Sequence, residues 1–197
     1  MDTYKTITTP VEGIYKEKGS KFLAFAIPVT TVEEVKEIVK NYRKEYYDAR
    51  HVCYAYMLGS ERNEFRANDD GEPSGTAGRP ILGQINSLEL TNVLVIVVRY
   101  FGGILLGTGG LVVAYKEATK DALNQAEIIE KTVDETVNIH FEYLLMNDVM
   151  RIIKETCAEI LNQSYEDKCN MQISIRKHDV LLLTSKLLKI IGVEIES

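Results

Sequence analysis

Apolar and polar residues alternate along the first part of the chain in a pattern that predicts strands and one early helix. Three segments have the pattern and length of short strands: residues 4–7, 11–15 and 22–27. In the segment that follows, apolar side chains recur every three or four positions, which is the period of a helix. Thr31 and Glu34 stand at its start with the spacing of a capping box. An amphipathic helix is therefore expected after the third strand.

The most apolar stretch of the chain is Val93–Val98, in which no position is polar. A strand of this kind is typical of the centre of a sheet with both faces covered. A β-type run at 52–58 precedes it, and a short helix is expected to have Pro80 at its first position. A longer helix is expected over 111–126.

After Glu130 the pattern changes to strand, helix, two strands, helix and strand. The expected segments are 133–141, 145–160, 164–168, 171–176, 180–191 and 193–196, with Cys169-Asn170 as a hairpin turn and Gly192 as a helix cap. This β-α-β-β-α-β order is the ferredoxin-like one. The sequence thus predicts an α+β protein with two domains, residues 1–130 and 131–197, joined near 128–132.

A glycine-rich connection follows the apolar strand and leads into the 111–126 helix. It begins with Arg99, and it contains Gly102, Gly103, Gly109 and Gly110. Glycine allows a positive φ and close approach, free N–H groups at a helix start favour an anion, and arginine can hold phosphate or carboxylate in a bidentate manner. Plain close packing is the alternative, because the run matches neither the P-loop nor the G-x-G-x-x-G pattern.

A second dense loop carries three carboxylates, on Asp69, Asp70 and Glu72. They could bind a cation or act as acid and base, or they could cap backbone N–H groups in a solvated turn. Arg79 or Arg99 could pair with them and hold the two loops together. We expect neither a metal nor a catalytic group here, but a binding site drawn from both loops: Arg79, Arg99, Gly102, Gly103, Gly109, Gly110, Asp69, Asp70, Glu72 and Thr76.

Both loops contribute a helix start, near Pro80 and near Gly110, and each start has an arginine beside it. These groups are expected to prefer an anion, with weak and salt-sensitive binding of a phosphate-bearing partner. Tyr100 and Phe101 could stack on a nucleobase, although aromatic residues beside a central strand are more often core.

Other candidates are weaker. His51 and Cys53 lie on one strand face, where burial without a chemical role is the commoner case. Lys16, Lys18 and Lys21 form the densest basic cluster, which fits a solvated hairpin turn or a contact to an RNA backbone.

Composition narrows the class of protein. The chain has 197 residues, a hydrophobic fraction of 45% and a formal net charge of −6. Neither half is basic, which argues against strong nonspecific binding to nucleic acid. No apolar stretch is long enough to span a membrane, no signal-peptide core is present, and three scattered cysteines do not form a disulfide framework. A cytoplasmic protein is expected.

Several motifs, in order, resemble the IMPACT family, specifically its bacterial two-domain members. They lie mostly within residues 1–130: Gly19-Ser20-Lys21-Phe22, Ala49-Arg50-His51, Asp69-Asp70-Gly71-Glu72-Pro73, Gly75-Thr76-Ala77-Gly78, Pro80-Ile81-Leu82, Val97-Val98-Arg99-Tyr100-Phe101-Gly102-Gly103, Leu106-Gly107, Gly109-Gly110-Leu111 and Ala114-Tyr115. The resemblance implies a first domain similar to domain 2 of ribosomal protein S5 and a second domain similar to one of elongation factor G. For eukaryotic members it implies a regulator that competes for an activator of the starvation-responsive initiation-factor kinase.

We therefore expect a non-enzymatic cytoplasmic protein that binds RNA or a ribosome-associated protein and possesses no cofactor. One alternative is an enzyme that binds a nucleotide or phosphate ligand at the glycine-rich strand-to-helix loop. A second alternative is a protein-interaction scaffold whose loops are simply close-packed.

Overall fold

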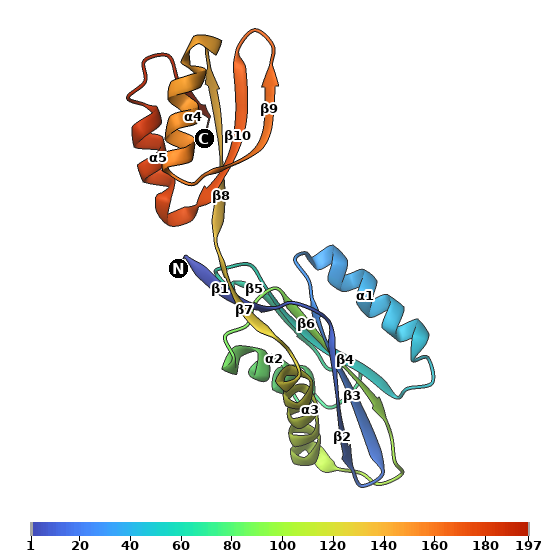
Figure 1. The fold of residues 1–197 in the computed structure, drawn as a ribbon. Coiled ribbons are helices and arrows are strands. Elements are labelled where there is room, and N and C mark those ends of the chain that lie inside the picture. Colours follow the sequence, from blue (N-terminus) through green and yellow to red (C-terminus); the bar gives the residue numbers. More distant parts are fainter. Residues whose placement is uncertain (1, 197) are drawn as a thin grey trace. The chain divides into compact units, whose positions relative to one another are not determined.

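The computed structural model describes residues 2–196, which form two compact units (Figure 1). The first unit comprises residues 4–131. The second comprises the chain from residue 132 onward together with Asp2 and Thr3. Helices and strands are mixed in both, as expected of an α+β protein.

The first unit is built on a five-stranded antiparallel sheet. Its strand order is β2-β3-β6-β4-β5. The strands are β2 (Val11–Glu17), β3 (Ser20–Pro28), β6 (Val93–Tyr100), β4 (His51–Leu58) and β5 (Glu64–Asn68). The sequence pattern did not indicate β5, because its residues are largely polar and exposed.

Helices cover both faces of this sheet. α1 (Val32–Glu45) lies on one face, and α2 (Gly78–Ser87) and α3 (Gly107–Asn124) lie on the other (Figure 1). The Thr31–Glu34 capping box at the start of α1 is present as expected. All residues of Val93–Val98 are buried, so the prediction of a central strand covered on both faces is confirmed.

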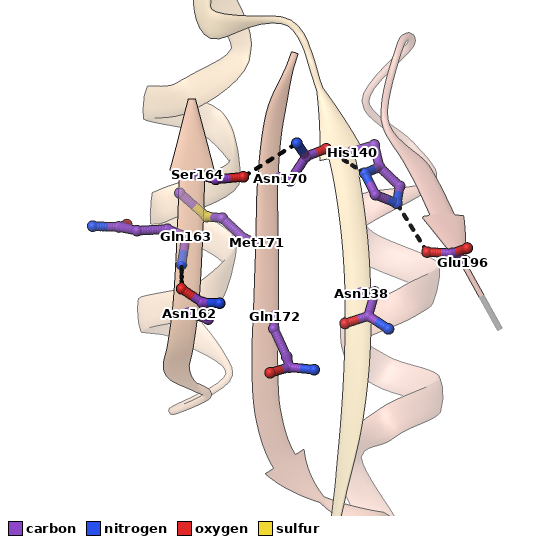
Figure 2. Close-up of a pocket in the computed structure, with 9 residues that line it drawn as sticks. All are labelled: Asn138, His140, Asn162, Gln163, Ser164, Asn170, Met171, Gln172 and Glu196. Carbon is purple, nitrogen blue, oxygen red and sulfur yellow. Dashed lines mark hydrogen bonds and ion pairs between the residues drawn. The ribbon is translucent and has the colours of Figure 1, made fainter. Parts of the chain in front are cut away.

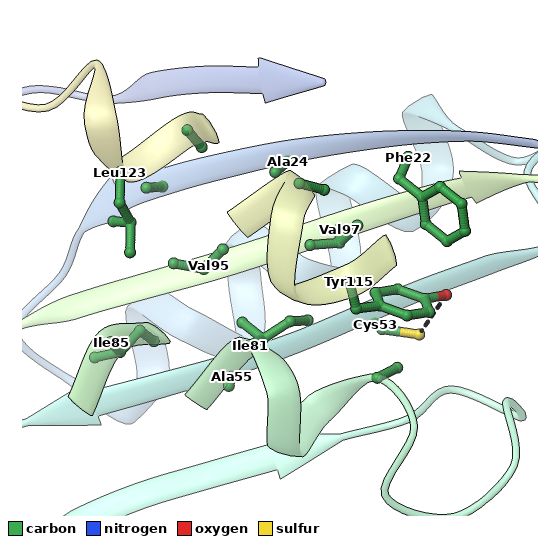
Figure 3. Close-up of a cluster of buried hydrophobic side chains, with 14 of the residues drawn as sticks. Phe22, Ala24, Cys53, Ala55, Ile81, Ile85, Val95, Val97, Tyr115 and Leu123 are labelled. Atoms are coloured by element: carbon green, nitrogen blue, oxygen red, sulfur yellow. Dashed lines mark hydrogen bonds between the residues drawn. The ribbon is translucent and has the colours of Figure 1, made fainter. Parts of the chain in front are cut away.

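The core under α2 and α3 combines small and large side chains from both the sheet and the helices (Figure 3). Ala24, Ala55 and Val95 leave room for Ile81 of α2 and Leu123 of α3. Burial of such apolar surface contributes about 25 cal/mol per Å².

A two-stranded sheet completes the first unit. It pairs β1 (Thr3–Ile7) with β7 (Ile128–Thr132). The segment near 128–132, expected only as a connection, is thus a strand. Both helix starts also differ from expectation: α2 begins at Gly78 rather than Pro80, and α3 begins at Gly107 rather than Leu111.

The second unit contains a four-stranded antiparallel sheet of order β11-β8-β10-β9. The elements are β8 (Asp134–Phe141), α4 (Met146–Glu155), β9 (Glu159–Tyr165), β10 (Cys169–Arg176), α5 (Val180–Leu187) and β11 (Glu194–Glu196), with short 3₁₀ turns at Tyr143–Leu145 and Lys177–Asp179. One sheet face and the two helices enclose its own apolar core.

Four expected boundaries in this unit differ from the structure. The strand expected over 164–168 is β9, which runs from Glu159 to Tyr165. The helix expected over 145–160 ends at Glu155, because Cys157 has a φ of +54° that breaks the helix. Ile160 lies instead in β9, opposite Ile173. The expected hairpin turn at Cys169 is strand, since Cys169 and its alternate neighbours on β10 are buried. Gly192, with a φ of +99°, lies in the turn before β11 rather than at the end of α5.

Within the described part of the chain, no helix is both long enough and apolar enough to cross a membrane.

Candidate functional site

The side chain of Asp69 caps the N-terminal end of α2. Its carboxylate accepts hydrogen bonds from the N–H groups of Gly75 (2.8 Å), Ala77 (3.1 Å) and Gly78 (2.8 Å). Burial alone would raise the pKa of this carboxyl, but the three N–H groups hold the pKa below its usual value. The chain's own carboxylate therefore accepts from N–H groups at the start of α2, where the sequence led us to expect an external anion.

Asp70 joins the acidic loop to the sheet. Its carboxylate accepts from the N–H of Val52 and from Arg43, both at 2.7 Å. Its φ is +45°. Its carbonyl oxygen lies 2.7 Å from His51 Nδ1, and because a carbonyl can only accept, Nδ1 carries the proton. This leaves His51 Nε2 facing the Glu72 carboxylate at 3.7 Å.

Glu72 is buried and binds two groups from other elements. Arg99 Nη1 of β6 donates to its Oε1 at 2.5 Å, and the Tyr115 hydroxyl of α3 donates to the same oxygen at 2.7 Å. Arg99 and Glu72 are only 5% and 8% exposed. This ion pair holds the acidic loop against the strand, which was one of the expected roles of Arg99.

Behind Tyr115 lies a buried thiol. Cys53 Sγ donates to the Tyr115 oxygen at 3.3 Å, in the contact drawn in Figure 3. Burial raises the pKa of Cys53 and of Tyr115 well above their usual values. The thiol is therefore protonated and inert, as expected for this position.

A cavity of about 370 Å³ opens beside Arg99. Its polar lining residues are Arg50, His51, Glu72 and Arg99. Its apolar lining residues are Pro73, Phe101, Leu105, Leu106 and Leu111, and Gly107 and Thr108 at the start of α3 complete the wall.

The start of α3 differs from those of α1 and α2 in the first unit. No described side chain caps it, and its first turn contains no acidic residue. Gly107 and Thr108 are exposed. The first N–H groups of a helix lack partners within the helix and carry a partial positive charge. The N–H groups of the first turn of α3, whose residues Gly107 and Thr108 line the cavity, therefore have hydrogen-bonding capacity to spare.

Arg99 has spare capacity as well. Its Nε is buried and has no hydrogen-bond partner among the described residues. Its guanidinium lies 5.5 Å from the centre of the Phe22 ring and 5.7 Å from that of Phe101, so two aromatic faces fix its position.

The glycines that follow Arg99 differ in how closely other atoms pack around them. Gly102 packs against the β2–β3 turn, where an added Cβ would meet the Gly19 carbonyl carbon at 1.9 Å. Gly103 has a φ of +88°. A Cβ on Gly103 or Gly109 would meet no heavy atom of the described chain within 4 Å. The positive φ that glycine permits is thus used at Gly103, and the Arg99–Glu72 pair connects the Arg99 loop to the acidic loop.

Two further expected residues lie outside the cavity wall. Thr76 is buried and donates to the Pro73 carbonyl at 2.6 Å, which closes the turn. Arg79 is exposed, and its side chain lies over Gly75. Within the part of the chain that the structure describes, no group of three or more His, Cys, Asp or Glu side chains is arranged to hold a metal ion.

Sequence reasoning missed several residues of the cavity, namely Arg50, His51, Leu105, Leu106 and Thr108. The strand register brings His51 beside Arg99 in the sheet. It stands opposite Arg99 in the β4–β6 pair, and Arg99 stands opposite Phe22 in the β3–β6 pair. The sequence contains the strands but does not show which strands are neighbours.

The second unit has a shallow hollow of about 280 Å³ on the sheet face that its helices leave open (Figure 2). Asn170 connects Ser164, at 3.3 Å, to His140, at 2.5 Å, and His140 Nε2 lies 3.2 Å from Glu196. The hydrogen bond to Asn170, followed by that to Glu196, raises the pKa of His140. The hollow is lined by amides, a hydroxyl and a carboxylate, with Met171 as its only apolar residue.

The fold and the cavity define an α+β protein of two units, the first with hydrogen-bond donors around an apolar hollow. The Impact N-terminal domain model matches residues 18–123. The IMPACT family member YigZ of Escherichia coli is 32% identical over 95% of this chain and 93% of its own length, and YvyE of Bacillus subtilis is 32% identical over 91% and 82%. The chain belongs to the IMPACT family, as its two-domain bacterial type.

A solved structure agrees over the whole chain. The crystal structure of a hypothetical protein superposes with a TM-score of 0.78 at 30% identity, and the match covers 100% of this chain and 98% of that one.

Proposed function

We propose that the protein acts in translation and that its first unit binds RNA at one end of the five-stranded sheet. The observation that supports this proposal is the gathering of cations and free N–H groups at that end. Register places Lys21 opposite Tyr100, and it places His51 opposite Arg99. The β2–β3 turn, with Lys18 and Gly19 at positive φ, lies against Gly102 in the loop that leads to α3 (Figure 1).

Four cations at this end have exposed side chains and no ion pair among the described residues: Lys16, Lys18, Lys21 and Arg50. They can approach phosphates without first losing a partner. Because the whole chain carries a net charge of −6, the expected binding is weak and strongly dependent on salt.

Of the two roles expected for Arg99, the structure shows the pairing with a loop carboxylate. Arg99 is buried and paired with Glu72, so it positions the loop rather than meeting an RNA backbone. Replacing Arg99 would disturb the fold and would not report on a phosphate contact.

The test compares two variants that each lose three positive charges. The first replaces Lys18, Lys21 and Arg50 by Ala. The control replaces Lys36, Lys40 and Lys120 by Ala, which are exposed on α1 and α3. Affinity for a single-stranded RNA oligonucleotide is measured at several salt concentrations.

The first variant should bind more weakly, and the slope of log affinity against log salt should fall by about 2, near 0.7 for each lost contact. The control should keep the wild-type slope. Equal slopes for both variants would contradict RNA binding at this sheet end and would favour the scaffold alternative.

The translation role needs its own measurement. Crosslinking in cells, followed by identification of the bound RNAs and proteins, should recover ribosomal material, and this recovery should fall in the Lys18, Lys21 and Arg50 variant. Recovery of material unrelated to translation would contradict the role.

We also propose the finer fold assignments. The second unit runs β8-α4-β9-β10-α5-β11 with β8 and β10 at the centre of its sheet, which supports a ferredoxin-like fold. The S5-like fold of the first unit is supported by the family resemblance.

A further inference from the structure

We propose that the cavity at the start of α3 binds a small molecule that carries one oxyanion group on an apolar body. This ligand site does not include the exposed lysines of the proposed RNA contact, and it shares Arg50 with that contact. Two independent features point to it: the uncapped start of an 18-residue helix, and the buried Arg99 Nε without a described partner on the same cavity wall.

The charges around the cavity suit a single negative group. Glu72 already balances Arg99 at 2.5 Å. Arg50 and the partial positive charge of the α3 start are left, and they match one carboxylate or one phosphate oxyanion.

The apolar side defines the rest of the ligand. Phe101, Leu105, Leu106 and Leu111 face the same space, and Leu105 is 82% exposed while Phe101 is 42% exposed. Binding of an apolar body in the cavity removes these apolar side chains from water, which favours binding. The volume of about 370 Å³ lies near the lower end of the range for small-molecule pockets, so the body is about the size of one or two rings.

The helix start supplies the donors that fix the oxyanion. The N–H groups of Gly107, Thr108 and Gly109 are in the first turn, and Gly107 has a φ of +71°. A Cβ on Gly107 or Gly109 would meet no described atom within 4 Å, so no side chain packs against these two α-carbons. The Thr108 hydroxyl stands beside them as one more donor.

Thr108 offers a matched pair of variants. Thr108→Asp places a carboxylate in the first turn, where it stabilises the helix and takes the position of the external anion. Thr108→Asn has nearly the same shape but no charge. Because Thr108 is exposed, both variants should fold.

The probes are phenyl phosphate, phenylacetate, inorganic phosphate and phenol, each titrated in phosphate-free buffer with the amide NMR signals of Gly107–Gly110 as the readout. Both phenyl anions should shift these signals at concentrations at least tenfold lower than inorganic phosphate does. Phenol should leave them nearly unchanged. The two phenyl anions distinguish a phosphate ligand from a carboxylate ligand.

Thr108→Asp should weaken phenyl phosphate binding at least tenfold, and Thr108→Asn should change it by less than about threefold. Leu105→Asn should weaken phenyl phosphate but not inorganic phosphate. Equal binding by the Asp and Asn variants, or the absence of shifts at Gly107–Gly110 with every probe, would overturn the proposal. Neither result depends on whether the protein binds RNA.

Discussion

Asp69 and Glu72 stand three residues apart in one loop, yet their carboxylates do different work. Asp69 satisfies three N–H groups at the start of α2, and Glu72 neutralises a buried arginine. A sequence shows three nearby carboxylates and suggests a shared site. The structure separates them because each carboxylate finds its partners on a different element.

Replacing Asp69 by Asn should destabilise the first unit by about 1–2 kcal/mol, since a charged cap is replaced by a neutral one. The pKa of Asp69 is lowered in the folded protein. Its stabilisation is therefore fully present above the ordinary pKa of about 3.9 and is lost as the pH falls through the folded value. Urea unfolding at pH 7 and pH 3 should show a difference between variant and wild type that shrinks at the lower pH. A difference independent of pH would contradict the capping role.

The Arg99–Glu72 pair should show strong coupling. Replacing Glu72 by Met leaves a buried guanidinium without its counter-charge, at a cost of about 3–5 kcal/mol. Replacing both residues by Met should cost much less than the sum of the two single changes. A double-mutant cycle from urea unfolding measures this. Additive losses would mean that the pair does not act as a unit.

At the scale of elements, two glycines between β6 and the first turn of α3 should respond differently to replacement by Ala. Gly102→Ala should destabilise the first unit by more than 1 kcal/mol, because its Cβ would meet Gly19 backbone at 1.9 Å. Gly109→Ala, in the first turn of α3 with open space around it, should be neutral or stabilising by up to about 1 kcal/mol. Urea midpoints compare the two. A similar loss of stability in both variants would contradict the difference in packing between Gly102 and Gly109.

Elements with strong periodicity could be read from the sequence, and those that depend on tertiary partners could not. The apolar strand at Val93–Val98 and the capping box at Thr31 are local signals, and both are confirmed. β5 is polar and forms only because β4 offers a neighbour, and β7 forms because β1 does. The cavity depends on strand register in the same way: Arg99 was identified from its loop, whereas His51 needed the β4–β6 pairing.

At the scale of the whole molecule, each of the two units has its own buried core, and we predict that each unit unfolds independently of the other. Ile81 in the first unit and Ile173 in the second are both fully buried. Replacing either by Ala should cost about 2–5 kcal/mol. Amide hydrogen exchange of the full chain should then quicken in residues 4–131 for Ile81→Ala and in residues 132–196 for Ile173→Ala. Faster exchange in both regions with either variant would reveal one cooperative unit.

The pairing of early with late residues has a consequence for how the molecule is assembled during synthesis. The Asp2 carbonyl accepts from Val133 N–H, and its carboxylate binds Arg176 and the N–H of His178. β1 likewise needs β7 at Ile128–Thr132. Asp2 and β1 therefore leave the ribosome before their partners are made, and they stay unpaired until more than half of the chain has been translated. An alteration at the start of the sequence acts on the unit whose residues are made last.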